Sequence, residues 1–162
     1  MPEYRVGTGF DAHALEEDVP LVLGGVAFDY PRGLAGHSDG DVLAHALIDA
    51  LLGAAGLGDI GELFSSDDQR WSGASSLDLL ARAYGRVQAA GWELVNADVI
   101  LIGQEPRIAR RRPELEERLS AAVGGPVSVR ATTTDGLGFT GRGEGLAAQS
   151  VALLRQRGEP AV

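Results

Sequence analysis

Residues 94–102, LVNADVILI, decide the fold class, because the run ends in four successive apolar residues just before Gly103. An apolar run of this length predicts a strand, and its nearly continuous apolar end indicates a central position in a sheet. A helical pattern precedes it at residues 75–90, and another follows from Pro113 to about Val123. Because strands and helices alternate along the chain, we expect a single α/β or α+β layer domain.

Toward the N-terminus, two strands and a helix are predicted. Residues 3–10 alternate loosely, and residues 21–30 predict a second strand that a glycine pair interrupts as a bulge or tight bend. Residues 32–40, RGLAGHSDG, predict a loop. Apolar residues at helical spacing then predict a helix from about Asp39 to Leu57, which Ser38 or Asp39 caps and which Gly56 and Gly58 end.

The remaining segments give weaker signals. Residues 58–74 are polar and glycine-rich, which favours a mobile loop, and residues 127–131 predict a strand. Residues 146–154, LAAQSVALL, remain open, because their composition favours a helix while their partial alternation favours a strand.

Size and composition limit the functions that this chain can have. The 162 residues suit one domain, taken here as residues 1–162. The absence of cysteine excludes disulfides, thiolate metal sites and cysteine nucleophiles, so any metal must be bound by histidine and carboxylate. A formal net charge of −9 argues against nucleic acid as a partner. With neither a signal-peptide pattern nor a long apolar run, we expect a cytoplasmic protein that has no membrane partner.

Histidine and aspartate form the first candidate site. Asp11 and His13 lie two residues apart near the end of a predicted strand, so their side chains project to the same side. His45 lies on the predicted helix in one stripe with Asp41 and Asp49. Two histidines and one carboxylate suit zinc, and the helix acids would then hold the second nitrogen of the imidazole. The alternative is that these acids simply satisfy a structural histidine.

Two glycine-containing loops form further candidate sites. In residues 131–145, ATTTDGLGFTGRGEG, threonine hydroxyls and backbone N–H groups suit phosphate oxygens, and Asp135 suits a hard cation. Residues 103–109, GQEPRIA, follow the predicted central strand and place Arg107 where it could meet an anion. Ordinary solvated turns remain the alternative for both loops.

Taken together and in order, these motifs resemble the 2-C-methyl-D-erythritol 2,4-cyclodiphosphate synthase family from about residue 4 to residue 155. The resemblance rests on FDAH at residues 10–13, the glycine pair at 24–25, HSDGDV at 37–42, DIG at 59–61 and the run from 131 to 145.

The resemblance implies a phosphorus–oxygen lyase of the non-mevalonate route to isoprenoids. The 2-phosphate of 4-diphosphocytidyl-2-C-methyl-D-erythritol 2-phosphate would attack the β-phosphorus, giving the cyclic diphosphate and CMP. The implied fold is α+β and ferredoxin-like, with a four-stranded sheet and helices on one face. The implied assembly is a homotrimer whose active sites lie between subunits. This fold favours a strand for residues 146–154.

The resemblance also assigns roles to residues. Asp11, His13 and His45 would bind Zn²⁺ or another divalent cation, and Asp135 would bind Mg²⁺ or Mn²⁺ with the substrate diphosphate. His37 and Thr133 would be catalytic. The cytidine diphosphate substrate would be contacted by Asp11, His13, His37, Ser38, Asp59, Ile60, Gly61, Phe64, Asp68, Gly103, Pro106, Arg107, Ile108, Ala109, Ala131, Thr132, Thr133, Thr134, Asp135, Phe139 and Arg142.

The chain departs from the family pattern at three places. Asp135 stands where many relatives have Glu, and Arg107 stands where Lys is frequent. The loop at residues 64–68, which would close over the site, lacks a Pro-Asp pair that is common in its middle. Two other functions fit the same motifs: a metal-dependent phosphohydrolase that releases inorganic phosphate, and a non-catalytic trimer that binds zinc and a nucleotide.

Overall fold

A computed structural model describes residues 1–158; residues 159–162, the end of the expected domain, lie outside the described part. Its main sheet has five strands in the order β4-β1-β7-β5-β6. All neighbours are antiparallel except β5 and β6, which are parallel. The strands are β1 (Tyr4–Glu17), β4 (Arg32–Leu34), β5 (Trp92–Ile102), β6 (Val127–Thr132) and β7 (Gly145–Gln156).

The sheet confirms the central position of residues 94–102, since β5 lies between β7 and β6. Four of its strands, β1, β5, β6 and β7, match the expected number, but a fifth strand, β4, pairs with the end of β1 through residues 15–17. The expectation of a four-stranded sheet is therefore wrong, because the sheet has five strands. The expectation of a loop throughout residues 32–40 is wrong for residues 32–34, which form β4. A three-residue strand containing Gly33 is too short to show an alternation in the sequence.

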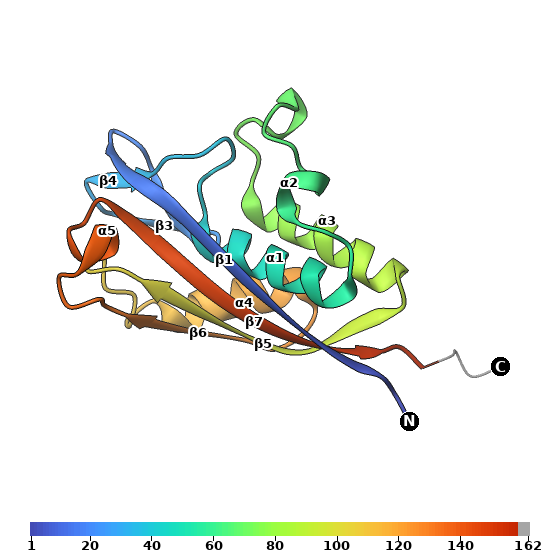
Figure 1. Ribbon diagram of the computed structural model, residues 1–162. Coiled ribbons are helices and arrows are strands. Elements are labelled where there is room, and N and C mark those ends of the chain that lie inside the picture. The colour runs from blue at the N-terminus through green and yellow to red at the C-terminus, as the bar shows by residue number, and fades with distance from the viewer. Residues whose placement is uncertain (159–162) are drawn as a thin grey trace.

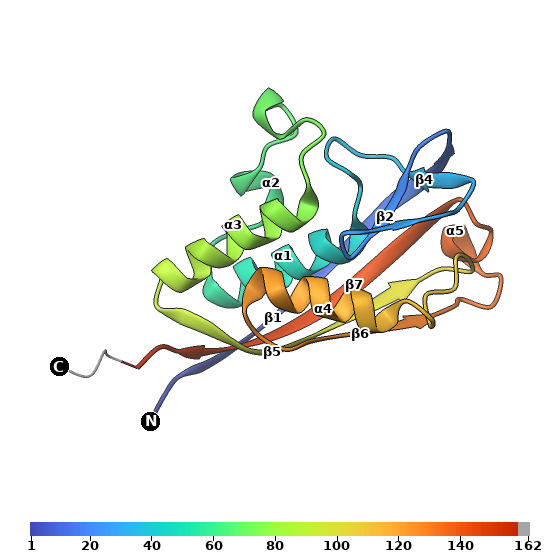
Figure 2. The same ribbon diagram turned by 180° about the vertical axis from the view of Figure 1, so that it is seen from behind.

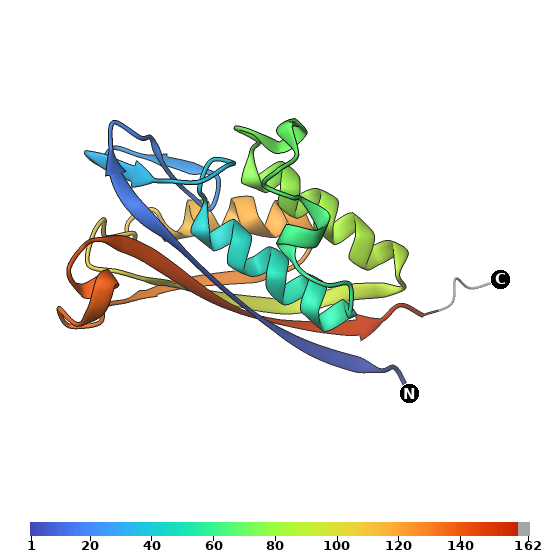
Figure 3. The same cartoon turned by 45° about the horizontal axis from the view of Figure 1, so that its top comes forward.

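Three helices cover one face of the sheet and leave the other face open (Figures 1 and 2). They are α1 (Val42–Ala55), α3 (Ser76–Ala89) and α4 (Arg112–Val123). Helix α1 lies between the sheet and α3, so all its residues except Asp49 and Gly53 are buried (Figure 3). The molecule is therefore a mixed α+β fold whose core lies between the sheet and the helices.

Two glycines allow α1 to rest directly on β1. A Cβ at Gly9 would lie 1.9 Å from the carbonyl oxygen of Ala46, and one at Gly7 would lie 2.1 Å from that of Ala50. Side chains at these positions would push the helix away from the strand. The close contact brings the first turns of α1 to the part of β1 that carries Asp11.

The glycine pair at 24–25 makes a hairpin turn. Both residues have positive φ, 58° for Gly24 and 73° for Gly25, which suits a two-residue turn between antiparallel strands. The strands are β2 (Leu21–Leu23) and β3 (Val26–Phe28), which form a separate two-stranded sheet. The prediction of one interrupted strand over residues 21–30 is therefore wrong, because the pair reverses the chain instead of bending it.

The segment expected to be a loop at residues 58–74 contains short helical turns, α2 (Ile60–Leu63) and the 3-10 turn η1 (Gln69–Trp71). Asp59 caps α2 by accepting a hydrogen bond from the N–H of Glu62. One more short helix, α5 (Gly138–Gly141), lies in the loop before β7. Turns this short carry too few residues for a helical period to be seen.

Strand β7 settles the open question over residues 146–154 in favour of a strand. It pairs with β1 on one side and β5 on the other, and this pairing overrides helix propensity. Ala148, Ser150 and Ala152 are buried beneath the helices, whereas Val151 is 44% exposed on the opposite face.

Among the described residues, no helix is long and apolar enough to cross a membrane.

Candidate active site

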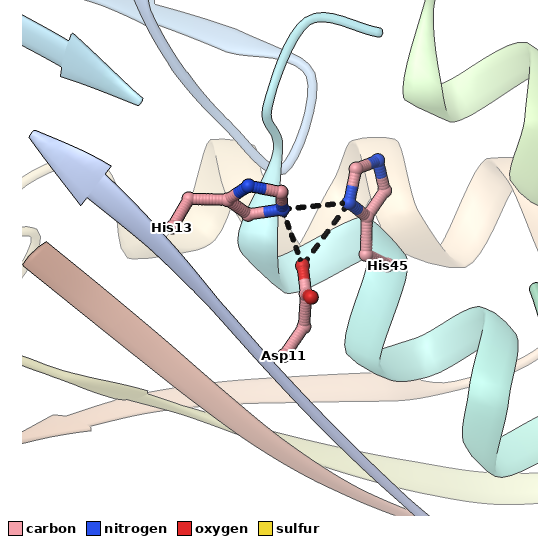
Figure 4. Close-up of side chains that lie close together, drawn as sticks. All are labelled: Asp11, His13 and His45. Atoms are coloured by element: carbon pink, nitrogen blue, oxygen red, sulfur yellow. Dashed lines mark hydrogen bonds and ion pairs between the residues drawn. The ribbon is translucent and has the colours of Figure 1, made fainter. Parts of the chain in front are cut away.

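A carboxylate and two imidazoles converge between β1 and α1. The Oδ2 atom of Asp11 lies 2.7 Å from Nε2 of His13 and 3.1 Å from Nδ1 of His45, and the two nitrogens lie 3.1 Å apart (Figure 4). Asp11 and His13 project to the same side of β1, as their spacing predicts. The three atoms are of the kind that bind divalent cations and point at one position, so this triad can hold a metal ion.

The carboxylate of Asp11 carries the charge that suits a cation. Burial by itself would raise the pKa of the Asp11 carboxyl, but hydrogen bonds with His13 and His45 outweigh burial and hold its pKa below the ordinary value. The hydrogen bond with Asp11 in turn raises the pKa of His13, against the opposing effect of burial. Asp11 is therefore an ionised carboxylate at neutral pH, the form that a metal ligand needs.

The second nitrogen of His45 does not meet the helix acids. Nε2 of His45 lies 2.8 Å from the hydroxyl oxygen of Ser76 and 3.0 Å from that of Ser38. The prediction that Asp41 or Asp49 holds this nitrogen is wrong. Asp49 instead accepts a hydrogen bond from the backbone of α2. No local pattern marks Ser76 as a partner of His45, because it comes from α3 and reaches His45 only through helix packing.

Asp41 is fully buried and organises the backbone beside the triad. Its carboxylate accepts hydrogen bonds from the N–H groups of Gly24, Gly25 and Ala44. It is thus the N-cap of α1, where Ser38 or Asp39 was expected. Burial raises its pKa to about 6, although the N–H donors from the glycine turn oppose the shift.

A hollow surrounds the triad and gathers a first group of predicted residues. Phe64 in its wall packs edge-to-face on Trp71, with 5.0 Å between ring centres. Trp71 was not predicted, although a tryptophan within a polar segment is itself a signal of burial. The predicted residues around the hollow are Asp11, His13, His37, Ser38, His45, Ile60, Gly61 and Phe64; Ser66, Trp71 and Leu79 are the additional ones.

Two predicted residues near this hollow do not line it. The Asp59 side chain caps α2, and the Asp68 carboxylate pairs with Arg70 at 2.6 Å, which holds the pKa of Asp68 below its usual value. Only the backbone of Asp68 approaches the site, since its carbonyl oxygen lies 3.2 Å from Nε2 of His37.

A second hollow lies where the parallel strands β5 and β6 end at the same edge of the sheet. Its volume of about 320 Å³ is at the lower end of the range for small-molecule sites, roughly 300–1,000 Å³. It shares no residue with the hollow around the triad. Its lining includes Gly103, Pro106, Arg107, Ile108, Ala109, Ala131, Thr132 and Thr133, all predicted, together with Gln104 and Glu105.

The other predicted residues of the 131–145 loop lie in neither hollow. Thr134 donates to the carbonyl oxygen of Leu137, and Asp135 accepts a hydrogen bond from the Thr133 hydroxyl at 3.1 Å. Phe139 is 41% exposed, and Arg142 pairs with the neighbouring Glu144. Within one chain, the structure therefore does not bring Asp135 to the triad.

The YgbB family model matches residues 4–155. The chain belongs to the YgbB family. A 2-C-methyl-D-erythritol 2,4-cyclodiphosphate synthase of Moorella thermoacetica is 56% identical over 156 residues, which are 94% of this chain and 96% of the relative. The resemblance inferred from the sequence motifs is therefore confirmed.

Solved structures agree with this YgbB assignment. The bifunctional IspDF from Campylobacter jejuni matches 96% of this chain with a TM-score of 0.92 and 43% identity, although the chain spans only 43% of that longer protein. A 2C-methyl-D-erythritol-2,4-cyclodiphosphate synthase in a CDP-bound form matches with a TM-score of 0.85 and 40% identity, covering 93% of this chain and 99% of that one. The fold of this YgbB protein is thus that of solved synthase structures.

Proposed function

We propose that the protein converts 4-diphosphocytidyl-2-C-methyl-D-erythritol 2-phosphate to 2-C-methyl-D-erythritol 2,4-cyclodiphosphate and CMP, in non-mevalonate isoprenoid biosynthesis. The observation that carries this proposal is the convergence of Asp11, His13 and His45 in a chain 56% identical to a named synthase. An oxygen of the 2-phosphate forms a bond to the β-phosphorus, and the bond from that phosphorus to the oxygen of the departing CMP breaks. Because both groups belong to the substrate, the protein needs no nucleophilic side chain.

For the cofactors, we propose Zn²⁺ at the triad and Mg²⁺ or Mn²⁺ near Asp135. The donor set fits zinc, because two imidazole nitrogens and one carboxylate oxygen leave a position for a substrate oxygen. A bound ion supplies positive charge that polarises the phosphate oxygens. Asp135 offers the carboxylate oxygen that a hard cation shared with a diphosphate requires.

The proposed roles follow the two hollows. His37 and Ser38 contact the substrate beside the triad, with Ile60, Gly61 and Phe64 around its methylerythritol part. The hollow at the ends of β5 and β6 receives cytidine, and the CDP-bound relative supports a nucleotide pocket in this fold. His37 and Thr133 are the proposed catalytic groups. Further substrate contacts are proposed for Asp59, Asp68, Thr134, Asp135, Phe139 and Arg142.

We propose a homotrimer of ferredoxin-like subunits, each a single domain, with active sites between subunits. Two observations support the assembly. The triad and the second hollow share no residue, so a neighbouring chain can complete the site. The open face of the sheet, defined here by Val6, Phe10 and Val151, exposes large apolar side chains that are 69%, 59% and 44% accessible. A cytoplasmic location stays a prediction.

The test is to incubate the metal-loaded protein with the diphosphocytidyl substrate and to quantify nucleotide and phosphate products. We expect CMP and the cyclic diphosphate in equal amounts. Release of inorganic phosphate without CMP would instead identify a phosphohydrolase. Tight binding of CDP without any turnover would identify a nucleotide-binding trimer.

A further inference from the structure

The two ring nitrogens of His45 face different partners. Nδ1 faces Asp11 and His13, whereas the other nitrogen points away from them (Figure 4). That nitrogen, Nε2, lies 2.8 Å from the hydroxyl oxygen of Ser76, a fully buried residue, and 3.0 Å from that of Ser38. A neutral imidazole has one N–H and one free lone pair. If Nε2 carries the hydrogen, the lone pair of Nδ1 is free to bind a cation; if Nδ1 carries it, that lone pair is absent.

The carboxylate of Asp39 decides where the hydroxyl hydrogen of Ser76 goes. One oxygen of Asp39 accepts the backbone N–H of Ser76 at 2.9 Å, and the other accepts the Ser76 hydroxyl. The N–H of Asp41 also donates to Asp39, at 3.1 Å, and holds the carboxylate in place. Because a carboxylate only accepts, the Ser76 hydroxyl donates to Asp39 and turns a lone pair toward Nε2 of His45.

We propose that Ser76 and Asp39 are positioning residues for cation binding at the triad. Together they keep the hydrogen of His45 on Nε2 and leave the lone pair of Nδ1 aimed at the cation. This inference rests on the proposed function, in which the triad binds a divalent cation. It adds two residues that touch neither the cation nor the substrate and that act only through His45.

The arrangement joins three parts of the fold at one hydrogen-bonded chain. His45 comes from α1, Ser76 is the first residue of α3, and Asp39 precedes α1. The neighbouring Ser75 provides a matched control, because it is exposed and makes no capping hydrogen bond with its side chain. Replacing Ser75 or Ser76 removes the same hydroxyl, but of these two residues only Ser76 contacts His45.

The first experiment measures the affinity of the full-length, metal-free protein for Zn²⁺ alone, by competition with a chelator. We expect Ser76→Ala to bind zinc about 10- to 100-fold more weakly than the unaltered chain. Ser75→Ala should bind within twofold of it. Circular dichroism melting of the metal-free proteins reports folding separately. Wild-type zinc affinity in Ser76→Ala would overturn the inference.

The second experiment needs no variant at Ser76. Nitrogen-15 spectra of the zinc-loaded protein, labelled at histidine, distinguish a metal-bound ring nitrogen from a protonated one. We expect His45 to be bound through Nδ1 and protonated at Nε2. Coordination through Nε2 would overturn the inference even if Ser76→Ala fails to fold. Asp39→Asn should also weaken zinc binding. The two carboxylate oxygens of Asp39 accept hydrogen bonds from three donors, namely two backbone N–H groups and the Ser76 hydroxyl, whereas an amide has only one accepting oxygen.

Zinc affinities of the variants distinguish an error about the metal site from an error about the roles of Ser76 and Asp39. If the unaltered chain binds no zinc, or if His45→Ala binds it equally well, the proposed metal site and the inference both fail. If His45→Ala loses zinc while Ser76→Ala and Asp39→Asn keep wild-type affinity, only the inference fails.

Discussion

The carboxylate of Asp41 accepts a hydrogen bond from the backbone N–H of Gly25 at 2.7 Å, across 16 residues of sequence. The same side chain accepts the N–H of Gly24 and caps α1 through Ala44. One buried group thus ties the β2–β3 turn to the start of the helix that carries His45. Its three N–H donors would have no acceptor without it.

Asp41→Ala should therefore lower the free energy of unfolding by about 3 kcal/mol or more, because buried donors without acceptors each cost roughly 1–3 kcal/mol. Chemical denaturation of the metal-free protein measures the loss. The control is Asp59→Ala, which removes an exposed N-cap and should cost less than about 2 kcal/mol. Equal losses in the two variants would contradict the role of Asp41.

The pKa of Asp41 also predicts how stability changes with pH. Burial raises this pKa to about 6 in the folded chain, whereas an unfolded aspartate titrates near 3.9. Between these values the folded state binds the proton more tightly, so this group makes the free energy of unfolding fall as pH rises from about 4 to about 6. The contribution is on the order of 3 kcal/mol.

Asp41→Asn removes this titration while keeping the shape of the side chain. Unfolding curves at several pH values should show a flatter dependence between about pH 4 and 6 than the unaltered protein shows. The other titrating groups remain in both proteins and cancel in the comparison. Identical slopes would show that Asp41 titrates normally in the folded state.

Zinc should stabilise the unaltered protein but not His45→Ala. At a free zinc concentration 100 times its Kd, binding adds about 2.7 kcal/mol to the free energy of unfolding. Thermal unfolding with zinc and with a chelator measures this gain. His37→Ala is the matched control, because His37 lies in the same hollow but outside the triad, and it should keep the gain. A zinc-induced gain in His45→Ala would remove His45 from the ligand set.

Gly9→Ala tests the contact between β1 and α1. The added Cβ would lie 1.9 Å from the carbonyl oxygen of Ala46, so the helix must move away from the strand. We expect a loss of about 3 kcal/mol in stability and weaker zinc binding, because His45 moves with the helix. Gly85→Ala, in the open on α3, should instead stabilise by about 0.4–1 kcal/mol. Unchanged zinc affinity in a folded Gly9→Ala protein would show that this contact does not position the triad.

Val151→Asp tests the proposed trimer. A charge on the open face opposes burial of that face against other copies, so the mass measured by analytical ultracentrifugation should fall from trimer to monomer. Activity should fall with it if active sites lie between subunits. Arg86→Asp, an exposed change on α3 away from the open face, should leave the mass unchanged. A trimeric and active Val151→Asp would place the interface elsewhere.

Much of this molecule was predictable from the sequence, because local patterns record burial. The apolar end of residues 94–102 placed β5 inside the sheet, helical spacing located α1, and helix start and stop residues located α3 and α4. The spacing of Asp11 and His13 put both side chains on one side of β1. These features depend on local signals, namely periods of two or about four residues and the residue types at helix ends, which a short window of sequence can display.

Other features depended on contacts between distant segments. The strand β4 exists because β1 pairs with it, and β7 is a strand because it has partners on both sides. The partners of His45 were also hidden: sequence proximity pointed to Asp41 and Asp49, but the packing of α3 on α1 supplies Ser76 from 31 residues away. Residue spacing thus determined which side chains could bind a cation, and only the packed structure decided which groups orient them, since a hydrogen bond across 31 residues leaves no period in the sequence.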